Sequence, residues 1–157
     1  MNRKKDKNPE LALEEITLSK EEASNLAEEM KLKLQMSSKP EIGTEFIPLM
    51  IAGLGDDRGL IRRTFVEILG VIGSPAVPSL RKALVYHSNV TVRRAAAKAL
   101  RLTGDPNALP DLLKALMNDK DPVVQGSSVG AMAVFGESAV KHLLKVLSNP
   151  RSTEMQC

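Results

Sequence analysis

Residues 76–104 read AVPSLRKALVYHSNVTVRRAAAKALRLTG, and this stretch decides the fold. Apolar side chains recur at helical spacing over residues 77–85 and again over residues 92–100. Between them stand His87-Ser88-Asn89, which interrupt the apolar stripe. Gly104 then offers the left-handed backbone that commonly ends a helix. The stretch therefore predicts two helices joined by a short turn.

The same pattern occurs over residues 46–73 and 108–136, and a fourth copy begins at Ala139. The three complete copies close on glycines spaced 31 and 32 residues apart. Self-similarity at such a period is typical of a solenoid, in which each unit packs only on its neighbours. The aligned positions are Pro48, Pro78 and Pro110, then Leu54, Leu84, Leu116 and Leu147, and finally Gly73, Gly104 and Gly136.

Each copy has a proline in its first helix, an Asp- or Asn-containing turn, and a second helix that opens with an apolar residue and, in two copies, arginine. These features resemble the HEAT repeat family in a short form, with a period below that typical of HEAT units. The expected fold is all-α, a right-handed α-α superhelix (solenoid) of HEAT-like helical hairpins with an N-terminal capping helix. The predicted repeats cover residues 41–73, 74–104, 105–136 and 137–157.

The two ends of the chain differ from the repeats. Residues 1–18 are expected to be disordered or partly helical. Residues 19–38 predict the capping helix, since Ser19 and Glu22 have the spacing of a capping box. The array over residues 41–157 stops inside its fourth hairpin, so we expect a truncated chain with an apolar edge around Leu143, Leu144 and Leu147.

Composition excludes several classes of protein. The net charge is +3, but aromatic residues are only 3% of the chain, which disfavours a nucleic-acid surface. Cys157 is the only cysteine, so no internal disulfide forms. No stretch is apolar over the length of a membrane span, and no signal peptide is visible, so a cytoplasmic location is expected.

No catalytic constellation, phosphate loop or metal-ligand cluster stands out in the sequence, so whether the protein is an enzyme stays open. The second helices carry the strongest functional signal, because they would line the concave side. Arg62 and Arg93 are interpreted as ties to turn carboxylates of neighbouring repeats. The basic residues assigned to a partner surface, with a solvated face as the equal alternative, are Arg63, Arg94, Lys98 and Arg101.

Gly126 and Gly130 lie four residues apart in the predicted second helix of the third copy, hence on one face. Glycine inside a helix costs about 1 kcal/mol relative to alanine. Tight packing against a neighbouring helix is the favoured explanation. The alternative is a smooth groove beside the basic surface, which would accept a flat ligand with carboxylates or a partner helix.

Three longer runs carry a closer resemblance. They are residues 55–63 (GDDRGLIRR), 89–98 (NVTVRRAAAK) and 121–127 (DPVVQGS). In this order they resemble the phycobilisome degradation proteins of cyanobacteria, a HEAT-like family related to the phycobilin (phycocyanobilin) lyases. The resemblance implies phycobiliproteins (phycocyanin, allophycocyanin) as partners and a role in dismantling the phycobilisome during nutrient starvation. It implies no required cofactor, but allows transient binding of phycocyanobilin and a lyase-like detachment of the chromophore.

Two functions therefore remain open. The first is a protein that binds phycobiliproteins and promotes loss of the bilin or disassembly. Because a bilin has two propionates, Arg63, Arg94, Lys98 or Arg101 would contact them through charge-assisted hydrogen bonds. The second is a scaffold that binds an acidic protein and performs no pigment chemistry. The oligomeric state is not determined by the sequence.

Overall fold

The computed structural model describes residues 15–37 and 42–149. Within these ranges all regular structure is helical and no strand occurs, which confirms the predicted all-α solenoid. The elements are α1 (Lys20–Met36), η1 (Thr44–Phe46), α2 (Ile47–Gly53), α3 (Gly59–Ile72), η2 (Ser74–Ala76), α4 (Val77–Tyr86), α5 (Val90–Thr103), η3 (Pro106–Ala108), α6 (Leu109–Asn118), α7 (Pro122–Ala133) and α8 (Glu137–Leu147).

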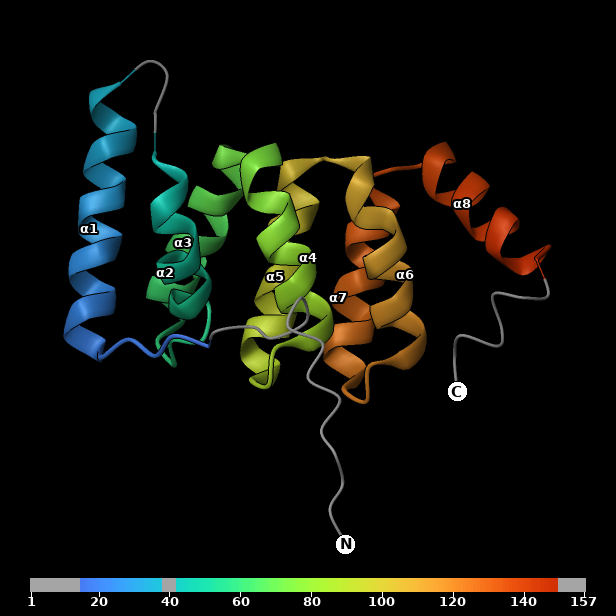
Figure 1. The fold of residues 1–157 in the computed structure, drawn as a ribbon, viewed down its shortest axis with the longest axis horizontal. Helices are drawn as coiled ribbons and strands as arrows, with labels where there is room; N and C mark the ends of the chain where they lie inside the picture. Colours follow the sequence, from blue (N-terminus) through green and yellow to red (C-terminus); the bar gives the residue numbers. More distant parts are fainter. Residues whose placement is uncertain (1–14, 38–41, 150–157) are drawn as a thin grey trace, which may run out of the picture.

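The hairpins stand side by side in chain order, from α1 at one end to α8 at the other (Figure 1). α4 and α6 lie in front of α5 and α7 in this view. First helices therefore form one layer and second helices form another. Packing follows the same order, since α3 contacts α5, α5 contacts α7, and α4 contacts α6.

The helices begin where the sequence supplies a suitable first turn. Pro48, Pro78 and Pro110 lie in the first turn of α2, α4 and α6, where a missing N–H costs little. At α1, the Ser19 hydroxyl accepts from the Glu22 N–H and the Glu22 carboxylate accepts from the Ser19 N–H. This reciprocal pair is the expected capping box.

Three glycines close the hairpins with positive φ. Gly73, Gly104 and Gly136 have φ of 74°, 62° and 51°. Other residues adopt this conformation only with strain, whereas glycine has no Cβ to clash. The chain therefore reverses at each of these positions and enters the next first helix through a short 3-10 turn after Gly73 and Gly104.

The core is mainly aliphatic, and at two glycines the side chain of a neighbouring helix lies too close to leave room for a Cβ. Phe65 of α3 is fully buried, and its ring lies against Gly53 of α2. A Cβ added at Gly53 would stand 2.3 Å from Phe65 Cε2, and one added at Gly70 would stand 2.5 Å from Leu102 Cβ. α5 adds four buried alanines, which let its neighbours approach closely.

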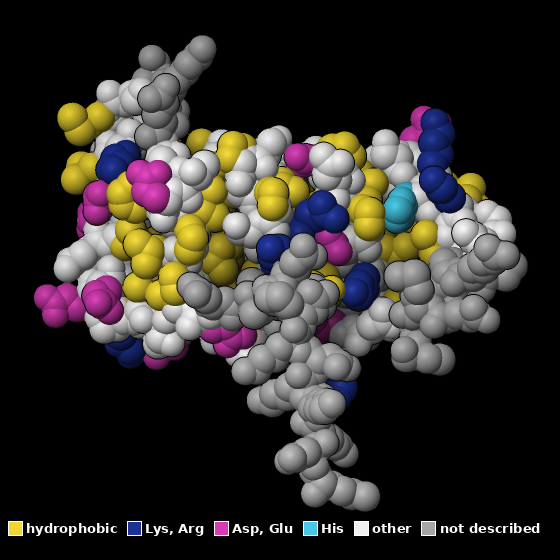
Figure 2. Space-filling view, in the orientation of Figure 1, with side chains coloured by type: hydrophobic (Ala, Val, Ile, Leu, Met, Phe, Trp, Pro, Cys, Tyr) yellow, Lys and Arg dark blue, Asp and Glu magenta, His cyan; other side chains and the backbone are white. Residues whose placement is uncertain are grey.

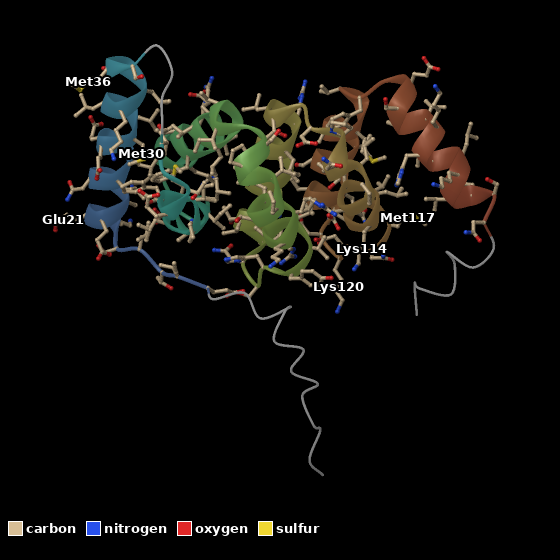
Figure 3. The ribbon with its side chains drawn as sticks, turned by 45° about the horizontal axis from the view of Figure 1, so that its top comes forward. Glu21, Met30, Met36, Lys114, Met117 and Lys120 are labelled. Carbon is tan, nitrogen blue, oxygen red and sulfur yellow. The ribbon has the colours of Figure 1, made fainter. Side chains whose placement is uncertain are left out.

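α1 covers the N-terminal end of the array. Ala23, Leu26, Ala27 and Met30 are buried, and α1 packs on α3. Met30 points toward the neighbouring helices while Glu21 and Met36 point away (Figure 3). The cap is thus apolar on one side and polar on the other, as an array end requires.

Residues 15–18, the described part of the predicted tail, form neither a helix nor a strand. Glu15 accepts hydrogen bonds from the Ser88 N–H at 2.8 Å and from the Ser88 hydroxyl at 2.5 Å. This segment therefore runs from α1 to the turn of the second hairpin. Residues 1–14 lie outside the described part of the chain.

α8 is held less closely than the other first helices. Ala139 is its one buried residue, while Val140, Leu144 and Leu147 are exposed. Leu147 is 76% exposed, whereas Leu84, at the same repeat position in α4, is fully buried. The apolar edge expected here is present at Leu144 and Leu147, and Leu143 is partly covered. Residues 150–157 lie outside the described residues.

No single helix within residues 15–37 and 42–149 has the length and apolar character to cross a membrane. The stretch from α3 through η2 and α4 passes such a test by length and composition only as a pair bent by 114°.

Candidate functional site: the second-helix cleft

The turns between the two helices of each hairpin share one hydrogen-bonded arrangement. Asp56, His87 and Asp119 occupy the same repeat position, and each side chain accepts from the backbone N–H two residues further on. Aspartate does this commonly in turns. His87 does it through Nδ1, so its proton is on Nε2 when the ring is neutral.

A second position closes the same turns from the opposite side. Arg62, Arg93 and Gln125 each donate to a backbone carbonyl six residues earlier. The accepting carbonyls belong to the turn position just described, in all three hairpins. Each second helix is therefore latched to the end of its own first helix by a side chain, which fixes the direction in which the second helix leaves the turn.

Arg93 also ties its repeat to the next one. Its guanidinium donates to both carboxylate oxygens of Asp119, at 2.9 and 3.3 Å. The two side chains are 19% and 7% exposed, so water screens them little. The predicted tie is confirmed for Arg93, but Arg62 bonds the carbonyl of its own turn and, among the residues that the structure describes, no neighbouring carboxylate.

Arg94 forms a second bidentate ion pair. It donates to Asp121 at 3.0 and 2.7 Å, and Asp121 also caps α7 by accepting from the N–H groups of Val123 and Val124. These bonds, led by the one from Arg94, lower the pKa of Asp121 to about 2. A depressed carboxylate pKa means stability that is present above the ordinary value near 4 and lost as pH falls toward 2.

The remaining basic residues of the predicted surface are freer. Arg63 pairs with Glu67 one helical turn away at 2.9 Å, with side chains 77% and 57% exposed. Such an exposed pair is worth about 0.3–0.5 kcal/mol and exchanges easily. Lys98 and Arg101 are exposed on α5 and form no ion pair within the described residues.

A cleft of about 500 Å3 lies along the second-helix layer, between α3 and α5. It brings together Arg63, Arg94 and Lys98 of the predicted set. Arg101, Gly126 and Gly130 do not line it. Its full lining is Gly59, Arg62, Arg63, Val66, Glu67, Thr91, Arg94, Ala95, Lys98, Leu102 and Val123, so one apolar strip is flanked by cations.

The close packing expected at Gly126 and Gly130 is absent. A Cβ added at either glycine would meet no atom within 4 Å. These glycines stand at the repeat positions that Arg94 and Lys98 occupy in α5, so the basic surface of the second helices ends at α7. The glycines that do accommodate a neighbour are Gly53 and Gly70.

Two other ties were not foreseen from the sequence. Arg58 donates to Asp56, to the Ser24 hydroxyl and to the Lys20 carbonyl, and thereby fastens α1 to the first hairpin. Arg81 of α4 donates to Asp111 of α6. The spacing of 30 residues, close to the repeat period, is the signal that marks Arg81 and Asp111 as neighbours.

The described residues contain no group of His, Cys, Asp or Glu that could hold a metal ion. The cleft presents cations, the carboxylate of Glu67, the hydroxyl of Thr91 and apolar side chains. The cations can bind carboxylates of a ligand, and Val66, Ala95 and Leu102 form the apolar part of the lining.

Comparison with known proteins supports this repeat architecture. HEAT repeats match residues 47–133 and 77–156. The chain is 49% identical over 140 residues to the bilin biosynthesis protein MpeU of Synechococcus sp. (strain WH8020), covering 89% of this chain and 47% of that protein. It is 36% identical to the uncharacterized phycocyanin operon protein Z of Pseudanabaena tenuis (strain PCC 7409), covering 66% and 54%.

The similarity extends to an unrelated activity. Deoxyhypusine hydroxylase of Aspergillus clavatus is 34% identical over 101 residues, which cover 62% of this chain and 30% of that enzyme. No solved structure matches. The chain spans about half the length of the first two relatives. By fold and by sequence, the chain belongs to the HEAT repeat family.

Proposed function

We propose that this protein binds phycobiliproteins and promotes their disassembly by acting on the bilin chromophore, with the α3–α5 cleft as the bilin contact. The observation that carries the proposal is the cleft itself, an apolar strip flanked by cations in a chain similar to a bilin biosynthesis protein. A bilin is a flat, largely apolar molecule with two propionates, and the cleft offers a counterpart to both properties.

The cations of the cleft differ in their readiness to bind. Lys98 has no ion-pair partner within the described residues and is the first candidate for a propionate. Arg63 becomes available when it leaves its exposed pair with Glu67. Arg94 would have to give up its two bonds to Asp121 to contact a propionate. It therefore contributes to the positive electrostatic potential of the cleft and forms no direct contact.

The test is an absorbance titration with two pigments, free phycocyanobilin and chromophorylated phycocyanin. Binding should shift the visible band of free phycocyanobilin, and Lys98→Glu should weaken that binding about tenfold, as expected when one charge-assisted contact becomes a repulsion. Lys120→Glu is the matched control, since Lys120 is also exposed but lies in the α6–α7 turn, away from the cleft.

The phycocyanin arm tests the direction of the chemistry. Loss of its visible band, or separation of its subunits in sedimentation, supports detachment and disassembly. A complex that forms without either change supports the scaffold function instead. The proposal is wrong if neither pigment responds to the wild-type protein.

A further inference from the structure

The face opposite the cleft carries its own charge pattern. Lys82, Lys114 and Lys145 occupy one repeat position on three successive first helices, α4, α6 and α8, and all three are exposed. Figure 2 shows dark-blue side chains of Lys and Arg over the middle and the α8 end of this face. Together α4, α6 and α8 hold five Lys or Arg and two Asp or Glu, a net +3, which equals the net charge of the whole chain.

These lysines differ from Arg93 and Arg94 of α5, which are paired with carboxylates. Within the described residues, none of Lys82, Lys114 and Lys145 forms an ion pair with a carboxylate. Lys114 donates to the Tyr86 hydroxyl at 3.3 Å, and its ammonium lies 5.2 Å from the centre of that ring. This contact crosses from α6 to α4 and holds the lysine on the surface without neutralising it.

A hollow of about 460 Å3 adjoins the row, where α8 inclines away from α6 (Figure 1). Its lining is mixed: the polar and basic residues are Arg81, Asn107, Ser138, Lys141, His142 and Lys145, and the apolar ones are Pro106, Leu109 and Pro110. Two of these cations have carboxylate partners, Arg81 with Asp111 and Lys141 with Glu137. Lys145 and His142 have none within the described residues, so the hollow extends the row of available donors.

The spacing of the row selects a kind of partner. Packed helices stand roughly 8–10 Å apart, so Lys82 and Lys114, at one repeat position on the packed helices α4 and α6, recur at about that distance. Seven residues of an α-helix rise about 10.5 Å. A helix lying across α4 and α6, with a carboxylate at every seventh residue, would therefore meet Lys82 and Lys114 with successive carboxylates, and its continuation would lead toward Lys145 on α8.

We propose that the first-helix face is a docking surface for an acidic helix of a protein partner, with Lys82, Lys114 and Lys145 as its contacts. The second-helix cleft is not needed for this docking. Lys114 and Lys120 lie toward the same end of α6 (Figure 3), so Lys120 serves as a nearby lysine outside the row.

Two synthetic helical peptides of roughly 20 residues and identical composition test the proposal. One has glutamates at every seventh residue, and the other has the same glutamates grouped at one end. Fluorescence anisotropy should show the evenly spaced peptide binding about tenfold more tightly, with affinity that falls between about 50 mM and about 300 mM salt.

The triple variant Lys82→Glu, Lys114→Glu, Lys145→Glu should lose at least tenfold in affinity, whereas Lys120→Glu should lose little. If the triple variant unfolds, single Lys82→Glu and Lys114→Glu variants give the same test. Unchanged binding by the variants, equal binding of both peptides, or displacement of the peptide by equimolar duplex DNA would each overturn the proposal.

The design separates this surface from the cleft. Lys98→Glu should weaken binding of the bilin but leave the peptide unaffected, and the triple lysine variant should do the reverse. Failure of one binding activity therefore leaves the other independently measurable.

Discussion

Two sets of cations on opposite faces of this solenoid differ in how they are paired. On the second-helix side, Arg93 and Arg94 are held by Asp119 and Asp121 of the next turn. On the first-helix side, Lys82, Lys114 and Lys145 have no carboxylate partner within the described residues. The comparison teaches that the count of cations on a helix does not give the charge available to a ligand. Partners in the neighbouring repeat decide it.

The largest effect is expected when one carboxylate is removed from the second-helix side, where the arginines are paired. Asp119→Ala should lower the free energy of unfolding by about 3 kcal/mol, because it leaves the mostly buried Arg93 guanidinium unpaired. It also removes the acceptor for the Asp121 N–H. Urea unfolding measures the change. Lys82→Ala is the control and should stay within about 0.5 kcal/mol.

A loss below about 1 kcal/mol for Asp119→Ala would contradict the contrast, since Arg93 would then be no more constrained than the lysines.

A smaller effect is expected at α7, where glycines stand at the repeat positions that Arg94 and Lys98 occupy in α5. Gly126→Ala and Gly130→Ala should each raise the free energy of unfolding by about 1 kcal/mol, because alanine favours the helix and the new Cβ meets no atom within 4 Å. Gly53→Ala should do the opposite, since its Cβ would collide with the Phe65 ring. Thermal unfolding of the three variants measures the sign.

If the α7 variants prove destabilising, the open face found at these two glycines would be wrong, and close packing would again be the better explanation.

The smallest effect concerns the turn in which histidine stands where the other two hairpins have aspartate. Burial, helped by the charge of Arg93, lowers the pKa of His87, although Glu15 opposes this shift. A lowered histidine pKa gives stability that is present above the ordinary value near 6.5 and is lost as pH falls below it. His87→Asn keeps an acceptor for the Asn89 N–H and should abolish that loss.

The measurement is the urea midpoint at pH about 7.5 and about 5 for His87→Asn and wild type. His142→Asn, on α8, is the control. An identical pH response in wild type and His87→Asn would show that the imidazole does not act as a neutral acceptor.

Much of the fold was predictable because it rests on local chemistry that recurs. The helical stripes, the first-turn prolines and the three closing glycines are each determined by a few neighbouring residues. The capping box at Ser19 is of the same kind. A period near 31 residues then makes one correct hairpin predict the next.

The site was less predictable because it depends on contacts between repeats. Arg93 and Arg94 are adjacent in sequence, yet one was interpreted as structural and the other as a partner contact. Both bind a carboxylate about 26 residues away, which only the packing of α5 on α7 reveals. The remaining assignments, Arg63, Lys98 and Arg101 to a partner, stay predictions.

The segment at residues 15–18 has a consequence for how the array unfolds. A repeat array with contacts only between neighbouring repeats can unfold one repeat at a time. Glu15, however, accepts hydrogen bonds from Ser88 in the second hairpin, and this contact bypasses the first hairpin. This bypass should couple α1 and the first two hairpins into one cooperative block, while α8 frays alone. Hydrogen exchange would then report two protection levels along the chain rather than a gradient.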